Sequence, residues 1–301
     1  MKKPAHVLAV TDFSEGSDEA LRQAHGYARM TDAKLTVLHV IPNVMPASPL
    51  LPEGSPHKTE EEVAMEQRAL DDLATRTRLV TGRLREDVEL AVRIGPVDAA
   101  AVAYAEQHHV DVLVVGATGR TGLARLLLGS TAERVIRHAH CSVLVARPSP
   151  ESERVLAATD LSTAALTAVE RAKDEVVWRG GRLDLLHVMD FSALAWPAAA
   201  GPLGGFSASI PPERMAQMRD LATRSLRELG GPGAEVHVVE GSPKRGIVAT
   251  AEAIQAGLIV LATHGRTGIA RMALGSVAEA VARVAHCSVL VVRPSPLLAQ
   301  D

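Results

Sequence analysis

Aromatic side chains are scarce in this chain of 301 residues, since phenylalanine, tyrosine and tryptophan together make up only 2% of it. Proteins that hold single-stranded nucleic acid usually stack the bases on aromatic side chains, so the scarcity argues against that class of function. Apolar residues nevertheless make up 47% of the chain, and aliphatic side chains must therefore fill its cores. Aliphatic cores suit buried parallel strands that are covered by helices.

The chain also has little net charge and little cysteine. Its 32 basic and 35 acidic side chains leave a formal charge of -3, which excludes a global basic field for nucleic acid or anionic membranes. The two cysteines, Cys141 and Cys287, are too few for a disulfide framework and match no metal-binding spacing. The apolar run from Val7 to Val10 is too short for a secretory signal. We therefore expect a cytoplasmic protein with no nucleic-acid or membrane partner.

What the chain does contain is a long internal repeat. At an offset of 146, residues 116–150 match residues 262–296 with identity at 24 of 35 positions, and at an offset of 148 Thr11-Asp12 matches Thr159-Asp160. A repeat of half the chain indicates duplication of one structural unit. The sequence therefore predicts two domains, residues 1–148 and 149–301.

Each half alternates short apolar runs with longer amphipathic segments, the pattern of an α/β fold with a parallel sheet. In the first half we expect strands at 6–10, 34–40, 87–93, 111–115 and 142–146, and helices at 14–30, 58–80, 96–108 and 130–138. In the second half we expect strands at 154–158, 183–188, 235–239, 258–262 and 288–292, and helices at 162–179, 212–229, 243–256 and 276–284.

A glycine-rich segment follows the fourth predicted strand of each half. In the first copy it reads Gly116-x2-Gly119-x9-Gly129-Ser130 and opens a helix. A glycine turn at the carboxyl end of a parallel strand lets backbone N–H groups approach a ligand, and a helix N-terminus favours an anion. A purely structural interpretation is also open, in which Ser130 with Glu133 and Ser276 with Glu279 form capping boxes.

Together with Asp12 after the first strand, this motif resembles the universal stress protein family, here as a tandem pair that covers nearly the whole chain. The resemblance implies that each half is a five-stranded parallel sheet of order 3-2-1-4-5 with helices on both faces. It further implies that ATP binds at the carboxyl ends of strands 1 and 4; whether Mg²⁺ accompanies the ATP stays open. The function implied is a stress-response or signalling protein that forms a homodimer, is not an enzyme and hydrolyses ATP slowly at most.

The resemblance also assigns site residues, one set in each half. In the first half Asp12 would meet the ribose or the adenine edge and Val40 would form a wall for the base. The other residues assigned there are Val115, Gly116, Gly119, Gly129, Ser130 and Thr131. The second set is Asp160, Val188, Leu261, Ala262, Gly265, Gly275, Ser276 and Val277. Arg120 and Arg266 are further candidates from their place inside the glycine segments, where they could fold over a triphosphate or be solvated. Ala262 stands where the pattern has its first glycine, so its methyl would crowd the sugar unless that backbone has a negative φ.

Some residues allow other interpretations. Asp12 and Asp160 could be ordinary turn residues. Lys244 and Arg245 begin a helix, where cations oppose the helix dipole; they could reach phosphate, but a surface role is favoured. His39 and His187 are expected to be hydrogen-bonded within strands, since no histidine has a metal-binding spacing.

Two other function classes compete with nucleotide binding. One is a nucleotide-free interaction scaffold that binds an apolar ligand or a protein through the region Ala199–Phe206, within the long segment 190–212. The other is an adenylyl-transfer enzyme, which would need a His-x-Gly-His signature. Thr263-His264-Gly265 lacks the second histidine of that signature, so the enzyme is disfavoured.

Overall fold

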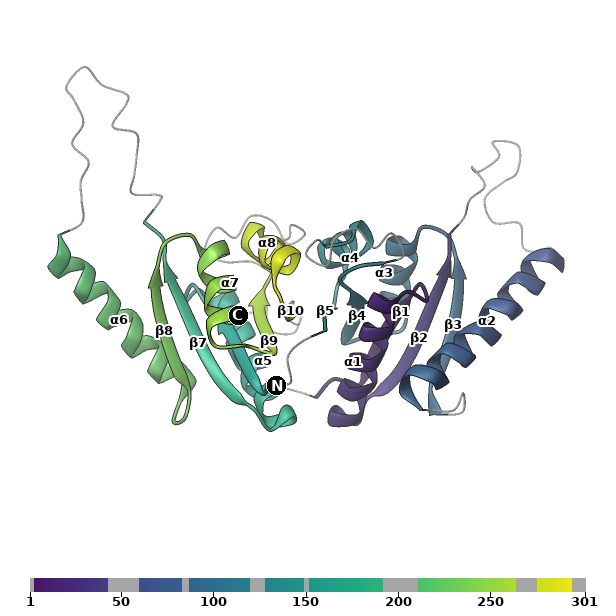
Figure 1. The fold of residues 1–301 in the computed structure, drawn as a ribbon, viewed down its shortest axis with the longest axis horizontal. Helices are drawn as coiled ribbons and strands as arrows, with labels where there is room; N and C mark the ends of the chain where they lie inside the picture. The colour runs from purple at the N-terminus through teal and green to yellow at the C-terminus, as the bar shows by residue number, and fades with distance from the viewer. Residues whose placement is uncertain are drawn as a thin grey trace, which may run out of the picture. The chain divides into compact units, whose positions relative to one another are not determined.

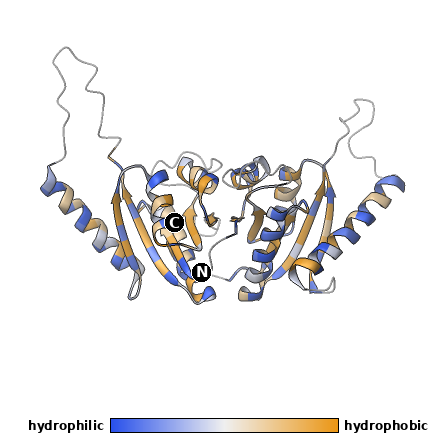
Figure 2. Ribbon diagram, viewed as in Figure 1, coloured by the Kyte–Doolittle hydropathy of each residue, from blue (hydrophilic) through white to orange (hydrophobic). Residues whose placement is uncertain are grey.

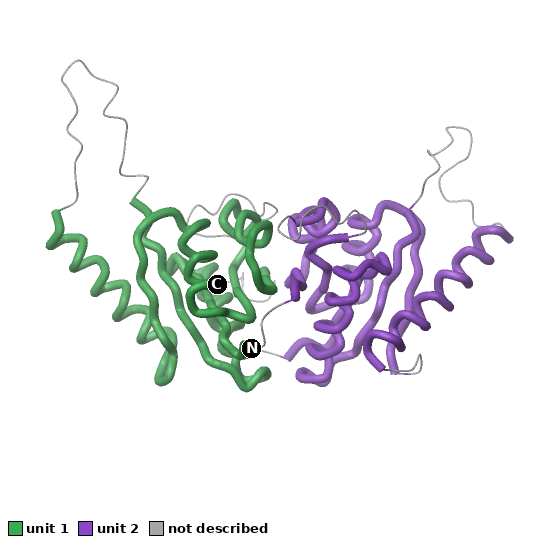
Figure 3. The backbone as a smooth tube through the Cα atoms, in the orientation of Figure 1, with its two compact units in different colours: residues 1, 149–301 green, residues 2–148 purple. Residues whose placement is uncertain are grey.

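A computed structural model describes residues 3–42, 60–82, 87–119, 128–148, 152–191, 211–263 and 275–293. The chain divides into two compact units, residues 2–148 and residues 149–301, called here the N-terminal unit and the C-terminal unit (Figure 3).

The N-terminal unit is a parallel sheet of order β3-β2-β1-β4-β5. Its strands are β1 (His6–Thr11), β2 (Lys34–Ile41), β3 (Glu89–Ile94), β4 (Val112–Gly116) and β5 (Ser142–Ala146). Its helices are α1 (Glu15–Thr31), α2 (Glu60–Thr81), α3 (Val97–Gln107) and α4 (Ser130–His138). Helices α1 and α2 pack together, as do α3 and α4, so that each pair covers one face of the sheet (Figure 1).

The C-terminal unit repeats this arrangement, with strand order β8-β7-β6-β9-β10 and every neighbouring pair parallel. Its strands are β6 (Arg154–Ala158), β7 (Arg182–Met189), β8 (Glu235–Glu240), β9 (Leu258–Ala262) and β10 (Ser288–Val292). Its helices are α5 (Thr163–Arg179), α6 (Pro212–Gly230), α7 (Pro243–Ala253) and α8 (Ser276–Val284). The predicted α/β class and the 3-2-1-4-5 order are thereby confirmed in both units.

The core of each unit lies along its central strands, which are apolar because helices cover both of their faces (Figure 2). Every residue of β1 is buried, and small residues on α1, such as Ala20 and Ala24, are fully buried against the sheet. Alanine at these positions lets the helix lie close to the strands, as expected for a core with few aromatic rings.

One predicted helix, over 243–256, is wrong at its end, since α7 stops at Ala253. Gln255 there has a φ of 53°, and the Ala256 N–H donates to the Ala251 carbonyl, which closes the helix. His109 does the same after α3, with a φ of 50°. These helix ends were not predictable from the sequence, because a left-handed residue after a helix is usually glycine or asparagine.

Among the described helices, none has both the length and the hydropathy that crossing a bilayer requires.

Candidate functional site

A cavity of about 300 Å³ opens in the N-terminal unit at the carboxyl ends of β1 and β4. These strands are neighbours, but the chain leaves them toward opposite faces of the sheet, and ligands of open α/β sheets bind at such a switch point. Of the candidates, the residues that line the cavity are Asp12, Val40, Val115, Gly116, Gly119, Gly129, Ser130 and Thr131. Arg120 lies outside the described residues.

Asp12 is held by a tight turn between β1 and α1. Its Oδ1 accepts hydrogen bonds from the backbone N–H of Ser14 at 3.1 Å and from the Ser14 hydroxyl at 2.5 Å. Ser14 in turn caps α1 by accepting from the Ser17 N–H, and Phe13 between them has a φ of 65°. The carboxylate is therefore fixed at the cavity wall by the same contacts that start the helix.

The second oxygen of Asp12 lies against the glycine segment. A Cβ placed on Gly119 would come within 2.8 Å of Asp12 Oδ2, so a glycine at this position lets the chain pass close to the carboxylate. The Gly129 N–H donates to the Ala117 carbonyl at 2.7 Å, which ties the two ends of the segment together.

Helix α4 begins at the cavity without a side-chain cap. Its N-cap residue is Gly129, which has no side-chain oxygen to offer, and Ser130 is the first helical residue. The alternative interpretation, in which Ser130 and Ser276 form capping boxes, is therefore wrong, since Gly275 holds the N-cap position of α8 in the same way. The backbone N–H groups of the first turn remain as donors at the cavity wall, which suits an anion.

The C-terminal unit has the corresponding cavity, of about 310 Å³. The candidates that line it are Asp160, Val188, Leu261, Ala262, Gly275, Ser276 and Val277. Gly265 and Arg266 lie outside the described residues. The turn is the same as in the first copy: Asp160 Oδ1 accepts from the Ser162 N–H at 3.0 Å, and Leu161 has a φ of 63°.

Gly116, the residue of the first copy that matches Ala262, allows helix α1 to pack closely against β4. A Cβ on Gly116 would lie 2.5 Å from the Gly16 carbonyl oxygen, and a Cβ on Gly16 would clash with the Thr118 carbonyl. Helix α1 thus approaches β4 backbone to backbone. In the second copy both glycines are alanine, Ala164 and Ala262, so that pair has changed together. The expected crowding of a sugar by a methyl at this position finds no support, because the Cβ direction at Gly116 leads to the helix.

Several cavity residues were not among the site candidates drawn from the sequence. In the first cavity they include Ser17, His39, Pro42 and Val97; in the second they include Thr159, Asp190, Pro243 and Ile247. Val97 and Pro243 lie at the start of the third helix of each unit, where the carboxyl end of β3 or β8 leads into the site. Their position shortly after a strand was the signal that could have identified them.

The two strand histidines are hydrogen-bonded, as predicted. His39 Nδ1 donates to the Thr11 carbonyl at 2.8 Å, and His187 Nδ1 donates to the Thr159 carbonyl at 2.9 Å. Phe13 packs on the His39 ring with centroids 4.3 Å apart. Each histidine therefore holds the end of β1 or β6 in position beside its acidic turn.

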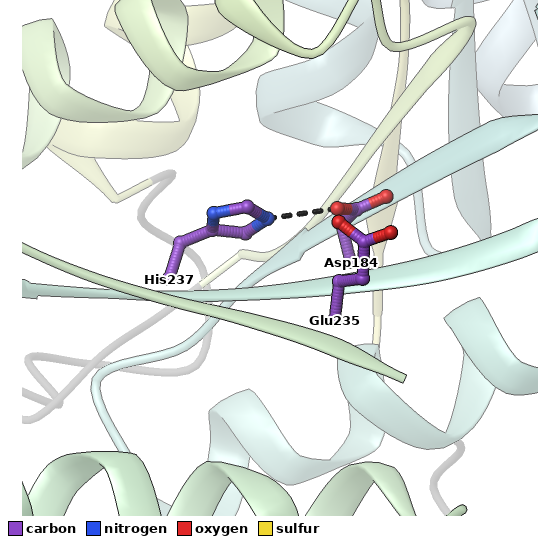
Figure 4. Close-up of side chains that lie close together, drawn as sticks. All are labelled: Asp184, Glu235 and His237. Carbon is purple, nitrogen blue, oxygen red and sulfur yellow. Dashed lines mark hydrogen bonds and ion pairs between the residues drawn. The ribbon is translucent and has the colours of Figure 1, made fainter. Parts of the chain in front are cut away.

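A separate polar cluster lies at the opposite, amino-terminal ends of β6, β7 and β8. Asp184, Glu235 and His237 offer ligand-type atoms within 4.8 Å of one another (Figure 4). Arg154 already binds both carboxylates, with contacts of 2.6 Å to Asp184 and 2.7 Å to Glu235, and His237 Nε2 lies 2.8 Å from Asp184 Oδ1. The guanidinium occupies the place that a cation would need, so the cluster is an ion-pair network.

Because of this ion-pair network, the stability of the C-terminal unit should depend on pH in the acid range. Burial alone would raise the pKa of Asp184, but hydrogen bonds from His237 and Arg154 lower it below its ordinary value. A carboxyl with a lowered pKa contributes stability above its unfolded pKa and loses that contribution as the pH falls through the folded pKa. We therefore expect the free energy of unfolding of the C-terminal unit to decrease as the pH falls below about 5.

The measurement is urea unfolding followed by tryptophan fluorescence, because Trp178 and Trp196 both lie in the C-terminal unit. Asp184→Asn, which cannot ionise, should flatten this part of the pH dependence. An equally steep acid loss in that variant would contradict the assignment.

In a comparison with known proteins, one family model matches the chain at two places. The model of the universal stress protein family matches residues 4–147 and 151–293. A universal stress protein of Mycolicibacterium smegmatis is 30% identical over 305 residues, which cover 96% of this chain and 97% of that protein. The crystal structure of a universal stress protein from Archaeoglobus fulgidus superposes with a TM-score of 0.66 at 23% identity, covering 96% of this chain and 98% of that one. Another universal stress protein, solved in complex with cAMP, matches 49% of this chain and 99% of its own length at 24% identity and a TM-score of 0.37.

Proposed function

Because the chain belongs to the universal stress protein family, we propose that it is a stress or signalling protein that binds ATP in both of its units. The observation that carries the proposal is the duplicated cavity, which places a fixed carboxylate, an aliphatic wall and an uncapped helix N-terminus around one space in each unit.

The chemistry of this space suits an adenine nucleotide. A carboxylate such as Asp12 accepts hydrogen bonds from ribose hydroxyls, and Val40 and Val115 give the base an apolar surface. The N–H groups at the start of α4 suit phosphate. The volumes of about 300 and 310 Å³ lie at the lower end of the range for small-molecule sites.

The test is calorimetric titration of nucleotide-free protein with ATP. We expect Asp12→Asn to weaken binding in the N-terminal unit about tenfold, or about 1.4 kcal/mol, since the neutral amide keeps the Ser14 contact but loses the negative charge. Asp160→Asn should have the same effect in the C-terminal unit. Asp72→Asn, on the exposed face of α2, removes the same charge away from both cavities and is the matched control.

A protein that binds no ATP, and releases no nucleotide on denaturation, would overturn the proposal. Mass spectrometry of the released material also separates this function from the nucleotide-free scaffold, whose proposed region, Ala199–Phe206, lies outside the described residues.

Proteins of this family are generally not enzymes, and we propose that ATP hydrolysis here is slow at most. We further propose that the chain forms a homodimer in the cytoplasm and that Mg²⁺ can accompany the bound ATP. The two cysteines of the chain, Cys141 and Cys287, are too few for a disulfide framework and suit a reducing compartment, and light scattering of the purified chain tests the dimer.

A further inference from the structure

Helices α7 and α8 lie side by side in the C-terminal unit (Figure 1). A groove of about 550 Å³ is lined by residues of these two helices. Its lining includes Lys244 and Arg245, on the first turn of α7, and Ser276 at the start of α8. Ser276 also lines the second nucleotide cavity, as does Pro243, the neighbour of Lys244. The groove, called here the α7–α8 groove, therefore adjoins that cavity.

The charged side chains of the α7–α8 groove leave an excess of positive charge. Glu279 pairs with Arg283 at 3.2 Å, which leaves Lys244 and Arg245 against the single carboxylate of Glu252. Within the described residues, neither Lys244 nor Arg245 makes an ion pair. Both are exposed and can turn toward an anion.

The placement of these two cations is unfavourable for the protein alone. The first turn of a helix favours acidic side chains, but α7 has none there. The uncapped start of α8 adds further positive potential beside the groove. An anion bound in the groove would reduce the repulsion between the two cations and the positive ends of the two helix dipoles.

The first copy lacks this arrangement at the matching positions. Residues 98 and 99 of α3, which correspond to Lys244 and Arg245, are Asp98 and Ala99. Arg134 of α4 reaches across to Asp98 at 3.6 Å and bridges the two helices. In the second copy Ala280 replaces that arginine. The charge on the first turn is thus reversed between the copies and the ion pair between the helices is missing.

We propose that the α7–α8 groove is an anion subsite that receives the outer phosphates of the nucleotide bound in the C-terminal unit. That unit then discriminates strongly between ATP and adenosine, whereas the N-terminal unit, with Asp98 and Arg134 paired, discriminates less. The inference rests on the proposed function, because the nucleotide cavity supplies the rest of the ligand's contacts.

The test is calorimetry on full-length protein that carries Asp12→Asn, so that the C-terminal site dominates. In this background Lys244→Ala/Arg245→Ala should weaken ATP binding about tenfold and leave adenosine binding within about twofold. The loss should shrink at high salt, because the contacts are exposed. Arg214→Ala/Arg224→Ala on α6, also exposed, removes the same charge elsewhere and should change neither affinity.

The outcomes separate the two proposals. Unchanged ATP affinity in the Lys244/Arg245 variant, while ATP and adenosine both bind, overturns the subsite and leaves the proposed function intact. Equal weakening of ATP and adenosine also overturns it, since the residues would then act on the fold. If the unsubstituted chain binds neither ligand, the proposed function fails and the subsite with it.

Discussion

Replacing Arg154 with methionine is expected to destabilise the C-terminal unit by about 3–5 kcal/mol, because the substitution leaves the carboxylate of Asp184 buried without its cation. The Asp184 side chain is 0% exposed, and both of its oxygens accept from Arg154, at 2.6 and 3.0 Å. His237 stays in contact with Asp184 but does not replace the fixed charge of the guanidinium. The measurement is the urea midpoint of tryptophan fluorescence, which reports on this unit alone.

Two variants control this result. Lys34→Met breaks the Lys34–Glu89 pair on β2 and β3 of the N-terminal unit, whose partners are 56% and 37% exposed. It should cost less than about 1 kcal/mol, measured by circular dichroism because that unit contains no tryptophan. Arg154→Met/Asp184→Leu should recover part of the stability, since neither charge is then left buried alone. If Arg154→Met unfolds at the same urea midpoint as the wild type, the prediction is contradicted, because water then solvates the Asp184 carboxylate in place of Arg154.

The second large effect is expected from Gly116→Ala in the N-terminal unit. The new methyl carbon would lie 2.5 Å from the Gly16 carbonyl oxygen and 2.7 Å from its carbon, so α1 must move away from β4. Overpacking of this kind costs about 1–3 kcal/mol. Because no tryptophan lies in this unit, the measurement is circular dichroism, in which this unit should unfold before the fluorescence transition.

The matched control is Ala262→Gly in the second copy. There the helix already accommodates a methyl, so the change should cost only about 0.5–1 kcal/mol, chiefly through the greater freedom of glycine in the unfolded chain. Equal effects at the two positions would contradict the backbone contact between Gly16 and Gly116. Gly116→Ala should also weaken ATP binding only in the N-terminal unit, because moving α1 displaces the turn that holds Asp12 at that cavity.

The sequence predicted the fold well because the pattern of each segment and the internal repeat indicate the same α/β arrangement. The alternation of apolar and amphipathic segments located each strand and helix, and the repeat identified the matching positions. The candidate cavity residues came from the resemblance to the family, and the positions of Asp12 and Asp160 directly after a strand agree with it.

What the sequence could not predict depends on geometry that only the folded chain sets. The capping residue of α4 depends on the backbone of Gly129, and the end of α7 on the left-handed conformation of Gln255. The ion-pair network of Arg154 depends on strand register, because Asp184 of β7 and Glu235 of β8 lie opposite each other only in the register that these two strands adopt. Likewise, the sequence gives no sign that Gly116 faces a helix.

The hydrogen bond from Gly129 to Ala117, matched by that from Gly275 to Thr263 at 2.7 Å, bears on how these sites can diversify. It joins Ala117, the neighbour of the cavity residue Gly116, to Gly129, which also lines the cavity. The distance between these two positions is therefore set by the described residues. Doubling the length of a flexible segment whose ends are joined in this way would cost only about 0.6 kcal/mol. A change of length between the two positions should therefore have little effect on the stability of the unit.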